Sequence, residues 1–153
     1  MNPARILVVD DEASIREVLT EYLSGFGYEV VAAADGEEAL RKFVAGRFDC
    51  IVTDLSMPRI DGLELIQRVR QQDKGVQILV ITGYPAIDSA VHAMKHGAYD
   101  YISKPFHMED LYLKIERAIH AHKTETSLKR SKSVVLTLVV LIPALLLLAL
   151  LYK

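Results

Sequence analysis

The segment Ile6–Asp11, ILVVDD, places four apolar residues directly before two aspartates. The same arrangement returns three times: CIVT precedes Asp54, ILVI precedes Thr82, and DYIS precedes Lys104. Short apolar runs of this kind are typical of parallel strands that are covered on both faces. Because the carboxyl ends of parallel strands line one crevice, we expect the polar residues that follow these runs to lie together.

Helix-like spacing of apolar residues alternates with short apolar runs, and this alternation occurs five times before residue 123. It indicates strand and helix repeats joined by right-handed crossovers. We therefore predict an α/β fold of the flavodoxin-like, doubly wound type, with a five-stranded parallel sheet in the order 2-1-3-4-5. The expected strands are Arg5–Val9, Glu29–Ala33, Cys50–Thr53, Gln77–Ile81 and Tyr99–Ser103.

Capping patterns predict where two of the helices begin. Ser14-x-x-Glu17 has the form of a capping box for the first helix, and Asp35-x-x-Glu38 has the same form for the second. The apolar face of the second helix continues to a stop signal at Gly46, where we expect that helix to end.

Charge divides the 153 residues into an acidic part and a basic part. Residues 1–122 hold 13 Lys and Arg against 19 Asp and Glu, whereas residues 123–153 hold 5 against 1. The acidic part has no basic stripe with interleaved aromatic residues, so we expect no nucleic-acid partner. The single Cys50 excludes an internal disulfide and fits a reducing compartment. The amino terminus has no signal-sequence pattern, which favours a cytoplasmic first domain.

The basic part predicts a membrane anchor. We expect a first domain at 1–122, a basic linker at 123–133 and a transmembrane helix at 134–152. The run Val134–Leu151 contains eighteen residues and no charge. As a helix it would span about 27 Å, close to the ~30 Å hydrocarbon core of a bilayer. Basic residues just before the run place the first domain on the cytoplasmic side. The expected location is the inner (cytoplasmic) membrane, through a single-pass tail anchor.

The predicted crevice gathers three carboxylates, a hydroxyl and an amine. Asp10, Asp11 and Asp54 suit Mg²⁺, which prefers a few carboxylates together with water and phosphate oxygens. A carboxylate can also attack phosphorus and form an acyl phosphate, and Asp54 is the best placed to do so. Lys104 supplies a positive charge for a phosphate oxygen, and Thr82 supplies a hydroxyl donor. These residue types indicate a site for a divalent cation and a phosphoryl group.

Four motifs carry a resemblance to a known family. ILVVDDE, DCIVTDLSMPRIDG, ILVITGY and GAYDYISKPF resemble, in order and in spacing, the bacterial two-component response-regulator receiver domain. The resemblance covers about residues 4–122. The variety most like it is the receiver of transcriptional activators of the nitrogen-regulation type, although we expect no output domain of that type in this chain. The resemblance implies a part in phosphorelay signalling.

The resemblance also implies how phosphorylation and metal binding are divided among the residues. Asp54 corresponds to the phosphoacceptor, which takes phosphate from a sensor histidine kinase, a phosphotransfer protein or a small phosphodonor. Asp10, Asp11 and Asp54 correspond to Mg²⁺ ligands, with the backbone carbonyl of Ser56 as a further ligand. The cofactor that the resemblance implies is therefore Mg²⁺.

Three more residues correspond to the parts of the family that respond to phosphate. Thr82 corresponds to the switch hydroxyl, and Lys104 to the amine that binds the phosphate. Tyr101 corresponds to the aromatic residue that turns inward behind the hydroxyl. The resemblance implies a cis peptide bond between Lys104 and Pro105.

We thus expect a membrane-tethered, single-domain response regulator that catalyses at most its own phosphorylation and dephosphorylation and acts on an unknown output protein. One alternative is a receiver-like adaptor that is never phosphorylated. Another is an aspartyl-phosphate phosphohydrolase of the haloacid-dehalogenase type, although such enzymes resemble D-x-D where this chain has Asp10-Asp11-Glu12. His92 and His96 lie four residues apart, but without a third ligand we expect a solvated helix face rather than a metal site.

Overall fold

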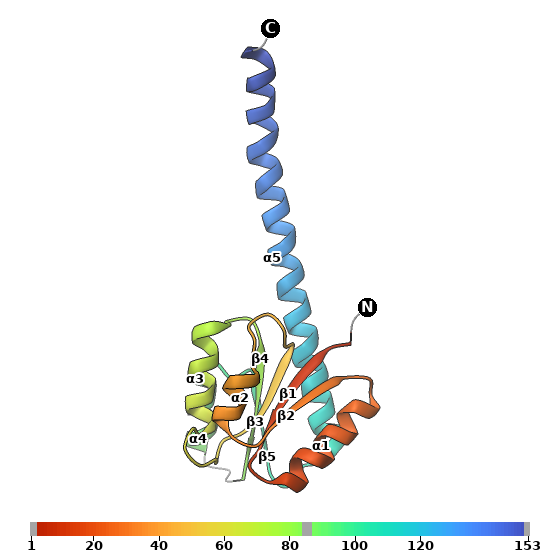
Figure 1. The fold of residues 1–153 in the computed structure, drawn as a ribbon, viewed down its shortest axis with the longest axis vertical. Coiled ribbons are helices and arrows are strands. Elements are labelled where there is room, and N and C mark those ends of the chain that lie inside the picture. Colours follow the sequence, from red (N-terminus) through yellow and green to blue (C-terminus); the bar gives the residue numbers. More distant parts are fainter. Residues whose placement is uncertain (1–2, 84–86, 152–153) are drawn as a thin grey trace. The chain divides into compact units, whose positions relative to one another are not determined.

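Five parallel strands form one sheet in the order 2-1-3-4-5, as predicted from the sequence. The computed structural model describes residues 3–83 and 87–151, apart from the side chains of residues 87, 130, 140 and 144–151. Figure 1 shows the strands side by side, with helices around them. The strands are β1 (Arg5–Val9), β2 (Glu29–Ala33), β3 (Cys50–Asp54), β4 (Gln77–Thr82) and β5 (Asp100–Ser103).

Helices cover both faces of this sheet (Figure 1). They are α1 (Ala13–Gly25), α2 (Gly36–Lys42), α3 (Gly62–Gln72), α4 (Ile87–Lys95) and α5 (Met108–Leu151). On one face, Leu19 of α1 and Ile115 of α5 belong to a single buried apolar cluster. On the other face, Ala39 of α2, Leu65 of α3 and Ala93 of α4 belong to a second cluster. The doubly wound arrangement is therefore observed as predicted.

Successive residues of β1 face the two helical layers in turn. Ile6 and Val8 lie in the cluster with α1 and α5, whereas Leu7 and Val9 lie in the cluster with α2, α3 and α4. The two-residue period of a strand produces this alternation. Because both faces need apolar side chains, the first polar residue after the strand is Asp10, at its carboxyl end.

The beginning of α1 differs from the prediction. The residue before the helix is Glu12, which has extended backbone and makes no side-chain capping hydrogen bond. Ser14 lies inside the first turn, so the predicted capping box is wrong. The carboxylate of Asp10 accounts for the difference, since its Oδ1 accepts the backbone N–H of Glu12 at 2.9 Å. The turn before the helix is closed by the site aspartate rather than by a serine.

The end of α2 also differs from the prediction. Its first turn is capped as expected, because Oδ1 of Asp35 accepts a backbone N–H three residues later at 2.8 Å. The helix ends at Lys42, and not at Gly46, because Phe43 has extended backbone. The ring of Phe43 is buried against that of Phe48, with 5.8 Å between ring centroids. Burial of this aromatic pair accounts for the early end of the helix.

The chain divides into two compact units, residues 1–122 and residues 123–153. Residues 123–133, the stretch expected as a basic linker, are helical and belong to α5. The Lys, Glu, Leu and Arg residues of this stretch favour helix.

The transmembrane helix expected at 134–152 is not supported by the structure. Over the described part of the chain, no helix is both long enough and apolar enough to cross a membrane. Residues 152–153 and the side chains of residues 140 and 144–151 lie outside the described residues.

Packing of α5 onto the sheet leads to a stability prediction. Ile115 is fully buried, whereas Leu113 on the same helix is 45% exposed. We expect Ile115→Ala to lower the free energy of unfolding by about 2–5 kcal/mol, because it removes buried methylene groups and leaves a cavity. The matched control Leu113→Ala should change it by less than about 0.5 kcal/mol. Urea unfolding of the full chain, followed by tyrosine fluorescence, measures both values. Equal losses in the two variants would contradict this view of the core.

Candidate functional site

The ends of β1 and β3 bring three aspartates together. The two strands are hydrogen-bonded neighbours, and Val9 pairs with Thr53 in their register. Asp10 and Asp11 follow β1, and Asp54 ends β3. Each aspartate offers one carboxylate oxygen, and these oxygens all lie within 4.8 Å of one another. The crevice predicted from the strand-end pattern is therefore formed.

Lys104 brings a positive charge to this cluster from the end of β5. Its Nζ lies 3.5 Å from Oδ2 of Asp10 and 3.9 Å from Oδ2 of Asp54. It also lies 3.8 Å from Oε1 of Glu12, a residue that the sequence analysis did not assign to the site. The position of Glu12 directly after the aspartate pair was a signal for this contact. One ammonium thus faces three carboxylates at once.

Burial makes the charged forms of Asp10 and Asp54 costly. Loss of hydration raises the pKa of both carboxyls above the ordinary value of 3.8. The backbone N–H of Glu12 and the charge of Lys104 oppose this rise at Asp10. At Asp54 the charge of Lys104 is the largest opposing influence, followed by the backbone N–H groups of Leu55 and Ser56. Burial outweighs these influences at both residues.

Two oxygens of the cluster lack hydrogen-bond partners. Oδ2 of Asp10 and Oδ1 of Asp54 are buried, and neither makes a hydrogen bond to any described residue. Such buried oxygens are rare unless a water or an ion satisfies them. A hard divalent cation that takes oxygen ligands, as Mg²⁺ does, fits this donor set of Asp10, Asp11 and Asp54.

Glycine at position 62 allows the backbone to pass close to the phosphoacceptor candidate. A Cβ atom at Gly62 would lie 2.4 Å from the carbonyl oxygen of Asp54, closer than any real side chain tolerates. The N–H of Gly62 donates to the carbonyl of Leu55 at 3.0 Å. The loop between β3 and α3 therefore turns back against the strand end from which it started.

Arg16 supports the aspartate pair from α1. Its Nη1 donates to the backbone carbonyl of Asp10 at 2.7 Å. Arg16 could not be assigned to the site from the sequence, because an arginine on a predicted helix gives no signal of which loop carbonyl it reaches. Arg16 thus fixes the backbone that carries Asp10 and Asp11.

The remaining predicted residues lie in different positions relative to the cluster. Thr82 is buried at the end of β4, and its carbonyl accepts the N–H of Lys104 at 2.8 Å. Ser56 is itself exposed, in the loop after β3. Tyr101 is 42% exposed and lies beside Ala90 and Met94 of α4. The peptide bond between Lys104 and Pro105 is cis.

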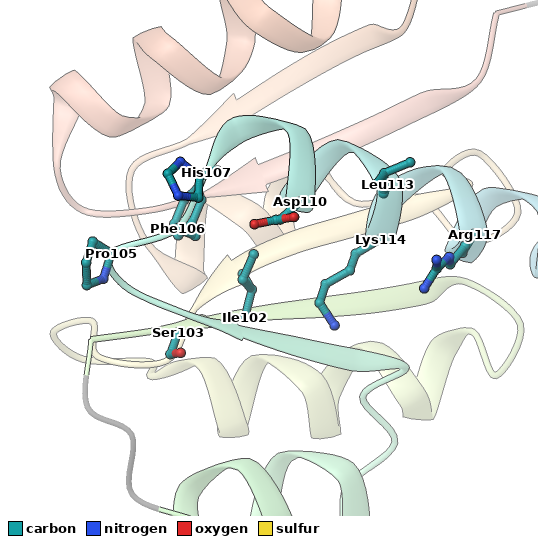
Figure 2. A pocket seen from close by; sticks show the side chains of 9 residues that line it. All are labelled: Ile102, Ser103, Pro105, Phe106, His107, Asp110, Leu113, Lys114 and Arg117. Atoms are coloured by element: carbon teal, nitrogen blue, oxygen red, sulfur yellow. The ribbon is translucent and has the colours of Figure 1, made fainter.

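A separate pocket of about 400 Å³ lies between β5 and the start of α5. Figure 2 shows Lys114 and Arg117 projecting from the same side of α5 along this pocket. Lys114 is paired with Asp100, and Asp110 adds a further carboxylate, so positive and negative groups balance. The aspartates of the cluster do not line it. The acid cluster, rather than this pocket, is the candidate site.

Other potentially reactive residues take no part in the site. Nδ1 of His96, the residue directly after α4, contacts the carbonyl of His92 in that helix at 2.7 Å. Among the described residues, the only metal-type cluster of His, Cys, Asp and Glu is that of the three aspartates. Cys50 is fully buried, and burial raises the pKa of its thiol to about 12. Cys50 belongs to the apolar cluster that contains Leu19 of α1 and Ile115 of α5.

The fold and the acid cluster define a class: flavodoxin-like α/β domains with an acidic crevice at the carboxyl ends of β1 and β3. Within it, the family model described as the response regulator receiver domain matches residues 6–116, and the chain belongs to that family. Receiver domains of response regulators are signalling domains of two-component systems rather than classical enzymes. Response regulators interact with histidine kinases or phosphotransfer proteins.

Individual relatives agree with this assignment. The chain is 44% identical over 109 residues to the response regulator MprA of Mycolicibacterium vanbaalenii, covering 71% of this chain and 47% of that protein. A response regulator receiver domain protein from Clostridium thermocellum superposes with a TM-score of 0.74 at 33% identity, over 79% of this chain and 98% of that one. NtrX from Brucella abortus, in complex with ADP, gives a TM-score of 0.76 at 34% identity, over 83% and 29%.

These relatives also limit what can be concluded from the similarity. The chain spans about half the length of the curated relatives that it matches. Its similarity to NtrX is of the same order as its similarity to the Clostridium thermocellum receiver, so the nitrogen-regulation type expected from the sequence is not singled out.

Removal of the buried charge at Asp54 should stabilise the metal-free protein. The pKa of Asp54 is raised in the folded state, so its contribution to stability is complete below the unfolded-state value and is lost as pH rises through the folded-state value. We therefore expect Asp54→Asn in EDTA to raise the unfolding midpoint at pH 7, with a smaller gain near pH 4. Thermal unfolding across this pH range measures the effect.

Asp88→Asn serves as the control, because Asp88 is exposed on α4. Because Asp88 lies in the first turn of α4, where a negative charge is favourable, this variant should not raise the midpoint at either pH value. A lower midpoint for Asp54→Asn at pH 7 would show that Lys104 stabilises the ionised carboxyl more than burial destabilises it.

Proposed function

We propose that this chain is a phosphoacceptor receiver of two-component signalling and that Asp54 accepts the phosphoryl group. The carboxylate of Asp54 supports this proposal most directly. It is buried at the end of β3, it shares a cluster with two further aspartates, and it lies 3.9 Å from the ammonium of Lys104. Such a site combines a nucleophile, ligands for a cation and a positive charge for the incoming group.

In the proposed step, a carboxylate oxygen of Asp54 forms a bond to phosphorus. With a phosphohistidine donor whose second ring nitrogen is protonated, the P–N bond breaks and a neutral imidazole leaves. With acetyl phosphate the bond between phosphorus and the acyl oxygen breaks, and acetate leaves. Asp10, Asp11, Asp54 and the Ser56 carbonyl are the proposed ligands of Mg²⁺, which when bound neutralises charge on the phosphoryl oxygens.

Phosphorylation changes the balance of charge around Lys104. Its ammonium lies near three carboxylates before the reaction, and we propose that it turns to a phosphoryl oxygen afterwards. Thr82, buried at the next strand end, then donates its hydroxyl to the phosphoryl group. Tyr101 is exposed before phosphorylation, and in the proposal it turns inward behind Thr82 afterwards. The face formed by α4, β5 and α5 changes as a result, and an output protein recognises that change.

Attachment to the inner membrane is a second part of the proposal, and the sequence of the second unit supports it. Residues 134–151 carry no charge. Their described apolar side chains are at least half exposed, and Leu136 reaches 66%. A run of exposed apolar side chains on one helix is costly in water unless lipid or another protein covers it. We propose that lipid covers it and that the receiver lies on the cytoplasmic side.

Phosphorylation of Asp54 is the first test. The full chain is incubated with acetyl phosphate and Mg²⁺, and its intact mass is measured. We expect the addition of one phosphoryl group to the wild-type chain, none to Asp54→Asn, and at least a tenfold lower rate in EDTA.

Asp88→Asn is again the matched control and should be phosphorylated at the wild-type rate. Full incorporation by Asp54→Asn would refute the assignment of the phosphoacceptor. Amide spectra that stay unchanged on addition of Mg²⁺ and beryllofluoride would favour the adaptor instead. Turnover of a panel of phosphoesters would favour the phosphohydrolase.

Membrane attachment is tested by fractionation. We expect the full chain to sediment with membranes and to remain there after carbonate extraction, because its apolar run is held by lipid. Leu136→Lys together with Leu141→Lys places two charges in the run and should release the chain into the soluble fraction. Recovery of the wild-type chain as a soluble monomer contradicts the proposed anchor.

A further inference from the structure

Arg59 has an unusual backbone conformation in the loop after the phosphoacceptor candidate. Its φ is +67°, and it is the only non-glycine residue in the described ranges with a positive φ. This left-handed conformation is unfavourable for residues with a Cβ atom. It persists where surrounding contacts impose it, and such positions often occur at functional sites. The contacts that impose it on Arg59 therefore identify what holds this loop.

The side chain of Arg59 connects the loop to the start of α2. Its guanidinium donates to the carboxylate of Asp35 and lies 4.0 Å from that of Glu37. Asp35 is the residue that caps α2, since it also accepts the N–H of Glu38. This N–H and the guanidinium of Arg59 hold the pKa of Asp35 below its ordinary value. Asp35 is thus a negatively charged residue that binds Arg59 while its own side chain is held at the start of α2.

A close contact next to Arg59 reinforces the connection. A Cβ atom at Gly36 would lie 2.6 Å from Cγ2 of Ile60 and 2.8 Å from the Ile60 carbonyl oxygen. Ile60 is therefore seated directly on the first turn of α2, and it is buried in the adjacent apolar cluster. The ion pair and this contact fix two consecutive residues of the loop to one helix end.

Residues 55–61, the acid-site loop, are held at both of their ends. At the far end, Gly62 packs against the carbonyl of Asp54. At the near end, the N–H groups of Leu55 and Ser56 act on the Asp54 carboxyl. Arg59 and Ile60 hold the middle to α2. Displacement of the middle would therefore move the groups of Ser56 relative to the acid cluster.

We infer that the ion pair between Arg59 and Asp35 positions the acid-site loop for binding of a divalent cation. Arg59 is a positioning residue: it acts through Ser56 and touches neither the cation nor the phosphoryl group. This inference rests on the proposed function, in which the Ser56 carbonyl is a ligand. The pair lies outside the acid cluster, so its loss leaves all three aspartates in place.

The exposure of the two side chains sets how much the loss of their ion pair should weaken Mg²⁺ binding. Arg59 is 57% exposed and Asp35 18% exposed, so water and salt screen part of their attraction. A pair of this kind contributes little, whereas loss of a group that supports a metal ligand weakens metal binding by tenfold or more. We expect a weakening of Mg²⁺ binding of about fivefold, between these limits.

A titration of the full chain with MgCl₂, followed by amide NMR in detergent micelles, tests the inference. Arg59→Gly removes the ion pair and relieves the backbone, and Asp35→Asn removes the charge while keeping a capping side chain. Each should raise the Kd for Mg²⁺ about fivefold, and the double variant should raise it no further, because both remove the same interaction. Arg59→Lys should restore most of the affinity.

Arg68→Ala is the matched control. It removes the pair between Arg68 and Glu64 on α3, which has a contact of 2.6 Å and an arginine of similar exposure, 49% against 57% for Arg59. This variant should bind Mg²⁺ as the wild type does. Amide exchange in the metal-free samples gives a second measurement: residues 55–61 should exchange faster in Arg59→Gly and at the wild-type rate in Arg68→Ala.

The outcomes separate the inference from the proposed function. If the wild-type chain shows no response to Mg²⁺, both are wrong. If the wild type binds Mg²⁺ and both Arg59→Gly and Asp35→Asn bind it equally well or more tightly, the proposed function stands and the positioning by Arg59 is refuted. Weaker binding in Arg68→Ala as well would show a general effect of surface charge and would also refute it.

Discussion

Two buried carboxylates, those of Asp10 and Asp54, share a single nearby ammonium, and the site depends on this imbalance of charge. Burial removes their hydration, and Lys104 compensates only in part. The fold therefore carries unfavourable electrostatic energy at one place. A cation bound there would release that energy and would thereby link occupancy of the site to the stability of the whole sheet.

The parallel topology produces the imbalance. β1 and β3 are adjacent at the centre of the sheet, so the aspartates that end them come close together. Lys104 reaches them from β5, and its backbone is fixed by the carbonyl of Thr82. The members of the site come from the ends of β1, β3, β4 and β5, so no short segment contains it. The site exists only when the sheet is assembled.

Fold and acid cluster were predictable because both follow from short, strong patterns. Apolar runs that end in polar residues gave the strands, and the strand order placed Asp10 beside Asp54. The contacts of Arg16 and Arg59 were not predictable, because they depend on how far a long side chain reaches across a loop. No spacing rule expresses that reach.

Local signals failed where tertiary contacts outweighed them. The helix after β2 ended early because the Phe43 ring turned into the core against Phe48. The serine signal at α1 failed because the Asp10 carboxylate had already taken the N–H that closes the preceding turn.

The burial of Cys50 allows site-specific labelling of this protein. It is the only cysteine in the sequence, it is fully buried, and its thiol remains protonated at neutral pH. In the folded protein, a maleimide therefore modifies a cysteine introduced on the surface and leaves Cys50 unmodified, so Cys50 need not be replaced. Spin labels or fluorophores can be attached near the acid-site loop on this background, while modification of Cys50 itself marks molecules that have unfolded.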